Sequence, residues 1–367
     1  MNEYRLLLST LGGLEDFLYS ELKEKLNVFI EKKEDGKVIC KADALGVFKA
    51  NFLLNSCERV SILLKDTEFS DLEDIYYITK SIPFEEFIQK NQSFRIVSER
   101  KGTHNFTSQD IAKITGQAVI DRYREKKKIR LKVDLEMPDI KVICKVIEKR
   151  ILIGLDTTGV GLHKRRYKTY IHRAGLNPCL AYSLVKFSGW NLEYSLYDPF
   201  CGAATILIEA YREALKIPNY LKERELAIWN LKFLPLKEFK VLSEELKQKV
   251  NIKALKIYGS DNSLKHLEGA KINAQNLNLS LNLFLADAQT ADFNYDFIVT
   301  NPPFGLRIGT KRKVKRVLEN FKERLLSFKG KWKNAVILSP LKDLFKEFRI
   351  KKRVIYGNLP VYILKYR

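Results

Sequence analysis

The spacing of apolar residues predicts short strands and helices that alternate over the first 160 positions. Apolar residues recur at helical spacing over 14–26, and a second helix is predicted from Ser108 to Tyr123, with Thr107 or Ser108 as its cap. Two alternating runs, Ile140–Val146 and Arg150–Leu155, flank a Glu-Lys turn and predict a β-hairpin. Further strands are expected at Tyr4–Ser9, Val38–Lys41, Arg59–Leu64 and Phe94–Ser98, and helices at Leu45–Leu54 and around Leu72–Ile78.

From Pro178 onward, apolar strands alternate with helices, which predicts a parallel α/β sheet. Residues 217–251 are polar and are expected to form a helical insertion, and the boundary between the two parts falls within 157–178. The predicted strands are Tyr194–Tyr197, Lys256–Gly259, Leu281–Leu285, Asp296–Val299, Asn334–Leu338, Val354–Tyr356 and Val361–Tyr366. The predicted helices are Leu180–Phe187, Thr205–Leu215, Ser263–Asn276 and Lys313–Leu326.

Polar side chains follow four of these strands at the point where the chain leaves the sheet. They are Asp198, Asp261, Asp287 and Asn301. Because open α/β sheets bind ligands at the carboxyl edge of their strands, we expect these side chains to line one site. An aspartate that caps a helix would occupy the same position, so each aspartate alone leaves that alternative open.

The turn after Asp198 favours the close approach of a ligand. Small residues at 202–204 uncover the backbone, and the helix that begins at Thr205 offers free N–H groups and a positive dipole end. Asp198 would bond an amine or a hydroxyl there. Asp261 suits two ribose hydroxyls, and Asp287 suits the exocyclic amine of a base.

The segment Asn301-Pro302-Pro303-Phe304-Gly305 is the most specific of the four strand ends. Its two prolines stop the strand and hold an extended, rigid turn. The turn aims the Asn301 side-chain oxygen and the Pro302 carbonyl at the two hydrogens of a planar amine, while Phe304 stacks on the ring that carries this amine. Because such an amine is a poor nucleophile, the reaction needs oriented acceptors and an activated methyl group.

Composition narrows the class of protein. The 367 residues include 46% hydrophobic residues and carry 65 Lys+Arg against 44 Asp+Glu, so we expect a globular protein of two or three domains with a net charge of +21. No apolar run is long enough for a membrane helix and no signal-peptide pattern is present, so we expect a cytoplasmic protein. Five scattered cysteines and four histidines lack the spacing of a disulfide framework or a zinc site, and we expect no metal.

The excess positive charge lies in two blocks. Residues 101–200 carry +9 and residues 301–367 carry +15. This clustering favours nucleic acid as the partner over a lysine-rich surface that is merely solvated. RNA phosphates are expected to contact the basic residues beside the amine motif, which are Arg307, Lys311, Arg312, Lys313 and Arg316.

With these motifs, residues 178–367 resemble the Rossmann-like, S-adenosylmethionine-dependent amino-methyltransferases. That family's first motif usually reads D-P-x-C-G-S-G-T and its amine motif reads [DNS]-P-P-[FY], and the segment from His172 to Ala181 resembles the entry to the catalytic domain of its RNA-guanine branch. The resemblance implies these cofactor-binding residues: Asp198, Gly202, Ala204, Thr205, Asp261, Asp287, Asn301, Leu176 and Asn177. It implies these catalytic residues: Asn301, Pro302, Pro303 and Phe304.

Ala204 departs from the family pattern, which has a second glycine at this position. The added methyl group would crowd the cofactor pocket. A backbone in the αR or β region at Ala204 would tolerate it.

Residues 1–160 resemble the THUMP module, with its preceding ferredoxin-like subdomain, of tRNA-modifying enzymes. The resemblance rests on Gly13-Leu-Glu, on the run from Arg95 to Ser108 and on the run from Gly154 to Tyr167. It implies an α/β protein with a ferredoxin-like subdomain at 1–65, an α+β THUMP domain at 66–160, a linker at 161–177 and a Rossmann-like methyltransferase domain at 178–367.

A basic turn in the THUMP-like region is expected to bind RNA. Arg100, Lys101 and His104 lie between a predicted strand and a helix start, a geometry that holds phosphates. A solvated basic loop is the alternative.

The resemblance implies a tRNA methyltransferase that uses S-adenosylmethionine to methylate N2 of a flipped-out guanine, with guanosine 6 of the acceptor stem as the expected target. The expected partner is tRNA, and a monomer is favoured. The alternatives are methylation of tRNA guanosine 10, of guanine N2 in ribosomal RNA or of adenine N6 in DNA. A non-catalytic RNA-binding protein with a decayed cofactor pocket is a further alternative.

Overall fold

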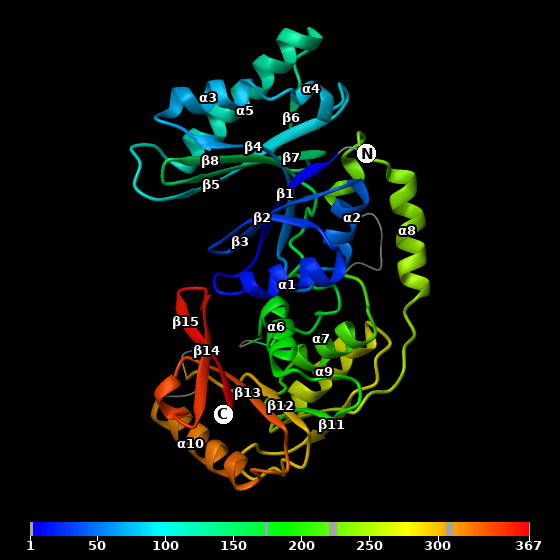
Figure 1. The fold of residues 1–367 in the computed structure, drawn as a ribbon, viewed down its shortest axis with the longest axis vertical. Helices are drawn as coiled ribbons and strands as arrows, with labels where there is room; N and C mark the ends of the chain where they lie inside the picture. Colours follow the sequence, from blue (N-terminus) through cyan, green and yellow to red (C-terminus); the bar gives the residue numbers. More distant parts are fainter. Residues whose placement is uncertain (1–2, 173–174, 220–225, 306–310, 367) are drawn as a thin grey trace.

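The protein consists of two halves, each built on one β-sheet and stacked along the long axis (Figure 1). The computed structural model describes residues 3–172, 175–219, 226–305 and 311–366. The N-terminal half holds an eight-stranded sheet in the order β2-β3-β1-β4-β8-β7-β5-β6, and the C-terminal half holds a seven-stranded sheet in the order β11-β10-β9-β12-β13-β15-β14. The predicted α/β fold class is confirmed. Among the described residues, no helix is long and apolar enough to cross a membrane.

The N-terminal sheet is continuous across both predicted subdomains. The predicted division between residues 65 and 66 falls inside β4, which pairs with β1 on one side and β8 on the other. The edge strand β2 was not predicted, because its sequence FIEKKE is mostly polar and exposed. The strands are β1 Tyr4–Ser9, β2 Phe29–Glu34, β3 Lys37–Ala42, β4 Arg59–Glu68, β5 Ser93–Lys101, β6 Lys132–Val133, β7 Ile140–Ile147 and β8 Arg150–Asp156. The helices are α1 Glu15–Lys25, α2 Ala44–Leu53, α3 Leu72–Lys80, α4 Phe84–Phe87 and α5 Ser108–Lys127.

The C-terminal sheet is parallel from β11 to β13 and gains an antiparallel pair, β15 and β14, at one edge. The strands are β9 Leu196–Asp198, β10 Ile257–Asp261, β11 Asn282–Leu285, β12 Phe297–Thr300, β13 Asn334–Ser339, β14 Phe348–Tyr356 and β15 Leu359–Tyr366. The helices are α6 Pro178–Ser188, α7 Thr205–Ala214, α8 Leu236–Gln248, α9 Leu264–Gln275 and α10 Lys311–Ser327, with the short 3-10 helices η2 Ala227–Asn230 and η3 Lys342–Leu344.

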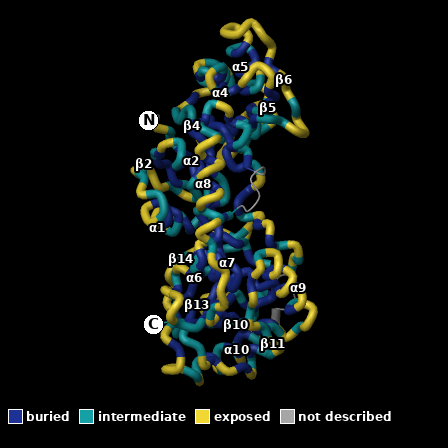
Figure 2. The backbone as a smooth tube through the Cα atoms, turned by 90° about the vertical axis from the view of Figure 1, so that its right-hand side faces the viewer, coloured by how far each residue is buried: buried dark blue, intermediate teal, exposed yellow. Residues whose placement is uncertain are grey.

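The predicted insertion packs on the N-terminal half, although its sequence lies within the C-terminal half. We call residues 226–248 the strap. In the strap, the ring of Phe239 stacks on the ring of Phe48 in α2, with centroids 5.0 Å apart. The Ile228 N–H of the strap donates to the Thr157 carbonyl at 2.9 Å. Figure 1 shows α8 beside α2, and Figure 2 shows its exposed outer face. Apolar side chains of the strap therefore pack into the N-terminal core, while most of its polar side chains face solvent.

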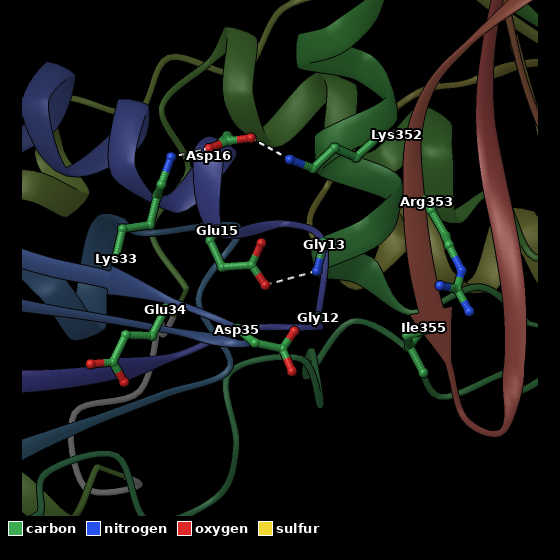
Figure 3. Close-up of a pocket in the computed structure, with 10 residues that line it drawn as sticks. All are labelled: Gly12, Gly13, Glu15, Asp16, Lys33, Glu34, Asp35, Lys352, Arg353 and Ile355. Carbon is green, nitrogen blue, oxygen red and sulfur yellow. Dashed lines mark hydrogen bonds and ion pairs between the residues drawn. The ribbon is translucent and has the colours of Figure 1, made fainter.

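The N-terminal half in turn contributes to the C-terminal core. Leu14 is fully buried in the hydrophobic core that lies on one side of the C-terminal sheet. The turn before Leu14 contacts the hairpin β14–β15, because the Ile355 N–H donates to the Gly12 carbonyl at 3.1 Å. Figure 3 shows this contact region, where Asp16 lies between Lys33 and Lys352 beside a cavity of about 510 Å³. Each half is thus completed by a segment from the other.

A buried ionic network joins the two halves at the predicted linker. Arg165 donates two hydrogen bonds to Glu209 of α7, at 3.2 Å each, and one to the Asn55 carbonyl of the N-terminal half at 2.9 Å. Arg212 also donates to Glu209, at 2.7 Å, and the side chains of Arg165, Glu209 and Arg212 are all at most 2% exposed. Arg165 therefore ties the two halves together through this buried network.

We expect Gly13 to be required for the close packing of the hairpin β14–β15 against the turn that precedes α1. Its φ of +95° favours glycine, and a Cβ atom there would clash with the Arg353 carbonyl of β14. We expect Gly13→Ala to lower the free energy of unfolding by at least about 2 kcal/mol, measured by urea denaturation. Gly330→Ala is the matched control, because Gly330 has a φ of +93° but nothing near its Cβ position. Equal losses in both variants would show that the hairpin contact contributes nothing.

Candidate functional site

The strand order brings the four predicted polar residues to one edge of the C-terminal sheet. β9 pairs in parallel with both β10 and β12, and β10 pairs with β11. Asp198 and Asp261 end β9 and β10, while Asp287 and Asn301 lie just past β11 and β12. The strand order reverses at β9, which is where open α/β sheets bind ligands.

Asp198 is a buried carboxylate at the centre of this edge. It is 1% exposed, and its Oδ1 accepts hydrogen bonds from the Thr300 hydroxyl at 2.6 Å and from the Phe200 N–H at 3.1 Å. Burial raises the pKa of Asp198 to about 7, although the bond from Thr300 acts in the opposite direction. A bound cation would favour the ionised carboxylate, so the site suits a positively charged ligand.

The backbone at Ala204 is left-handed. This residue has φ 59° and ψ 26°, so it does not adopt the αR or β conformation that would tolerate an alanine. Ala204 is the last residue of a turn that is closed by its N–H, which donates to the Cys201 carbonyl at 2.7 Å, and α7 begins at the next residue, Thr205. A left-handed alanine costs about 1–2 kcal/mol. Its methyl group is fully buried and belongs to the hydrophobic core that also holds Leu207, which offsets part of this cost.

Asp261 is held by the same turn. Its Oδ2 accepts from the Gly202 N–H at 3.1 Å, and its Oδ1 accepts from the Ser263 N–H at 3.0 Å and lies 3.1 Å from His266 Nδ1. The His172 ring packs edge-on against His266, with centroids 4.2 Å apart. Neither histidine was predicted as a site residue, because His266 meets Asp261 of β10, and His172 meets His266, only in the folded chain.

Asp287 is bonded to its neighbour Gln289. The Gln289 amide donates to both Asp287 oxygens at 3.1 Å, and the Gln289 backbone N–H donates to one of them at 2.9 Å. The Gln289 side-chain oxygen accepts from Asn320 of α10 at 2.9 Å. The Asp287 carboxylate is thus occupied by the amide of Gln289, and its contact with the amine of a base stays a prediction.

The Asn301 side chain presents a buried acceptor that no described residue of the chain bonds. Its Oδ1 is shielded from solvent and accepts no hydrogen bond within the described part of the chain. Pro302 is buried, while Pro303 and Phe304 are half-buried, with Phe304 packed against the core. A buried acceptor that lacks a donor is costly unless a ligand supplies one. The geometry therefore fits a hydrogen-bond donor, such as an amine, at this point.

Two predicted cofactor residues have structural contacts. The Asn177 side chain caps α6 by accepting from the Cys179 N–H at 2.8 Å and donates to Glu58 at 2.8 Å. Leu176 is 4% exposed and belongs to the core. Their contacts with a cofactor stay predictions.

The predicted RNA-binding residues form two separate groups. Arg100 and Lys101 line a cavity of about 350 Å³ in the N-terminal half, and His104 lies 3.4 Å from Arg100 and 2.8 Å from the Glu148 carbonyl. In the second group, Arg312, Lys313 and Arg316 are exposed in the first turns of α10. Arg307 and the side chain of Lys311 lie outside the described residues.

Both halves of the chain are similar in sequence to known protein families. The RMKL-like methyltransferase domain model matches residues 165–356, and the THUMP domain model matches residues 69–156. The chain is 35% identical over 366 residues to the tRNA (guanine(6)-N2)-methyltransferase of Methanocaldococcus jannaschii, covering 95% of each protein. The chain belongs to this THUMP-containing guanine-N2 methyltransferase family. Both the family and the enzyme class predicted from the sequence are confirmed.

Solved structures share the fold of this methyltransferase. A possible methylase from Clostridium difficile 630 superposes with a TM-score of 0.91 at 25% identity, covering 100% of this chain and 98% of that chain. The structure of SMU.472, complexed with SAH, superposes with a TM-score of 0.89 at 21% identity, again covering 100% and 98%. Both the THUMP half and the methyltransferase half are therefore arranged as in known proteins.

Proposed function

We propose that this methyltransferase transfers the methyl group of S-adenosylmethionine to N2 of guanosine 6 in the acceptor stem of tRNA. The observation that carries the proposal is the unpartnered Asn301 oxygen, buried beside the strand that ends in Asp198. The relative from Methanocaldococcus jannaschii carries the same activity in its name. The cytoplasm is the proposed location, where tRNA is the partner.

The residues of the sheet edge fit S-adenosylmethionine, which supplies an activated methyl group when it is bound. Asp198 is placed for the positively charged methionine end of the cofactor. Asp261 and Asp287 lie at the ends of the next two strands, β10 and β11, and are placed for its ribose and its adenine. Gly202, with a φ of 51°, and Thr205 lie at the turn into α7, and we expect both to contact the cofactor from the start of that helix.

The amine motif orients the guanine for attack. The Asn301 side-chain oxygen and the Pro302 carbonyl accept the two hydrogens of the guanine amine, and Phe304 stacks on the ring. With S-adenosylmethionine bound, the amine nitrogen would bond to the methyl carbon while the bond from that carbon to the cofactor sulfur breaks, and S-adenosylhomocysteine would be the leaving group. The acceptors Asn301 and Pro302 would stabilise the positive charge that develops on the nitrogen. The extra proton then leaves to solvent.

The test is to map the methylated nucleotide. The protein is incubated with unmodified tRNA and labelled S-adenosylmethionine, and the tRNA is digested and analysed by mass spectrometry. N2-methylguanosine at position 6 is the expected product. Methyl incorporation at position 10, or confined to ribosomal RNA or DNA, would overturn the proposed target, and no incorporation into any nucleic acid would overturn the proposed activity.

The basic start of α10 is proposed to contact RNA phosphates. It holds no acidic residue in its first turn, so its cations lie where the helix dipole does not favour them. We expect the double variant Arg312→Ala/Lys313→Ala to weaken tRNA binding about tenfold and to reduce the slope of log affinity against log salt by about 2. The matched control is Lys237→Ala/Lys240→Ala, two exposed lysines of the strap. Identical salt slopes for the two double variants would contradict this contact.

A further inference from the structure

Thr300 links the two parts of the proposed site. Its hydroxyl donates to Asp198 Oδ1 at 2.6 Å, and the two residues are 0% and 1% exposed. A bond between a hydroxyl and a carboxylate at this length is strong, and burial removes competition from water. Thr300 also directly precedes Asn301 in the chain.

This side-chain bond holds the end of β12 where the backbone pairing to β9 has stopped. The register between the two strands pairs Phe297 with Leu196 and Ile298 with Tyr197, and it ends there. On its other side, β12 stays paired with β13 as far as Thr300. The hydroxyl of Thr300 therefore forms a side-chain contact that ties this end of β12 to the end of β9.

The position of Asn301 depends on that fixed backbone. Its acceptor oxygen has no partner among the described residues, so no hydrogen bond to that oxygen orients the side chain before substrate binds. A small displacement of a positioned group lowers a reaction rate steeply. Thr300 is in the right place to prevent such a displacement.

We propose that Thr300 is a positioning residue that couples the cofactor carboxylate Asp198 to the amine acceptor Asn301. This inference rests on the proposed function and deepens it. When a cationic cofactor binds, Asp198 is ionised, and the bond from the Thr300 hydroxyl strengthens. The amine acceptor is then held most firmly when the methyl donor is present.

Besides Asp198, the ionisable groups at this edge of the sheet include Asp261 of β10 and the histidines His172 and His266 beside it. Burial is the main cause of the raised pKa of Asp198, and Asp261 adds to it. Burial raises the pKa values of Tyr197 and Cys201, which keeps both neutral, and lowers the pKa of His172. Because Asp198 titrates near pH 7 and its ionised form favours a cation, the affinity for S-adenosylmethionine should rise as the pH increases through 7.

The test compares Thr300→Val, which keeps the shape but removes the hydroxyl, with Thr300→Ser, which keeps the hydroxyl. We expect Thr300→Val to raise the dissociation constant for S-adenosylmethionine about tenfold at pH 7 and to move the midpoint of its pH dependence up by about one unit. With saturating cofactor, the single-turnover rate on tRNA should also fall about tenfold. Thr300→Ser should restore all three values to within about twofold of the wild type.

Two controls separate the positioning role from a loss of stability. Thr115→Val removes another fully buried hydroxyl, in α5, and should leave cofactor affinity and its pH midpoint unchanged. In an Asp198→Asn background, Thr300→Val should add little, because the two residues act through one bond. If the wild type binds S-adenosylmethionine and Thr300→Val has the same affinity, pH midpoint and rate, the inference fails. If the wild type does not bind the cofactor at any pH, the proposed function itself fails.

Discussion

Asn301→Ala is expected to lower the rate constant of methyl transfer at least about a hundredfold while tRNA affinity stays within about twofold. The variant removes the buried Oδ1 acceptor that stabilises the charge developing on the guanine amine, and removing one such group from a preorganised site has effects of this size. The phosphate contacts that dominate RNA affinity lie elsewhere and are unchanged. The measurements are single-turnover methyl transfer with saturating cofactor and a tRNA-binding titration.

Two further variants sharpen this result. Asn301→Asp keeps an acceptor oxygen and should retain more activity than Asn301→Ala. Asn191→Ala is the matched control, since Asn191 is exposed and its side chain accepts from the Glu193 N–H, a local bond far from the strand ends of the site. Turnover of Asn301→Ala at the wild-type rate would refute the role of Asn301 as the amine acceptor.

Glu209→Gln is expected to lower the free energy of unfolding by about 3–5 kcal/mol. The change keeps the shape of the side chain but leaves Arg165 and Arg212 buried without a carboxylate, and breaking a buried ion pair from one side has this cost. Urea denaturation followed by circular dichroism measures it. Because the network joins the two halves, their separate unfolding should also become visible.

Its control is an exposed ion pair. Glu319→Gln removes a carboxylate that is 42% exposed and lies 3.8 Å from Lys315, so the change should be below about 0.5 kcal/mol. A loss for Glu209→Gln as small as that of the control would contradict the role of the network.

The pH dependence of this contribution has a definite sign. Burial raises the pKa of Glu209, but the charges of Arg165 and Arg212 outweigh burial and hold that pKa below its usual value. Its stabilisation is therefore present above the pKa that it has in the unfolded chain and is lost as the pH falls through its folded pKa.

Local patterns in the sequence determined most of the individual elements. The predicted strand Tyr4–Ser9 is β1, and the predicted hairpin is β7 and β8. The predicted cap Thr107 forms a capping box with Asp110 at the start of α5. These features depend on residues a few positions apart, so the hydrophobic period and the capping chemistry suffice to find them.

The strand-end motifs likewise followed from the sequence, because polar residues at consecutive strand ends of an α/β sheet must meet at one edge. Asp198, Asp261, Asp287 and Asn301 do meet there. Their roles toward cofactor and amine stay predictions.

Only the tertiary structure decided how these parts are joined. The strap was recognised as a polar helix, but a helical pattern does not say which half its apolar face covers. The bond from Thr300 to Asp198 spans 102 positions, and the joint of Arg165 with Glu209 spans 44. The left-handed backbone of Ala204, between β9 and α7, is also a feature that only the structure showed. Sequence patterns report on neighbours along the chain, whereas these features depend on which distant segments the fold brings into contact.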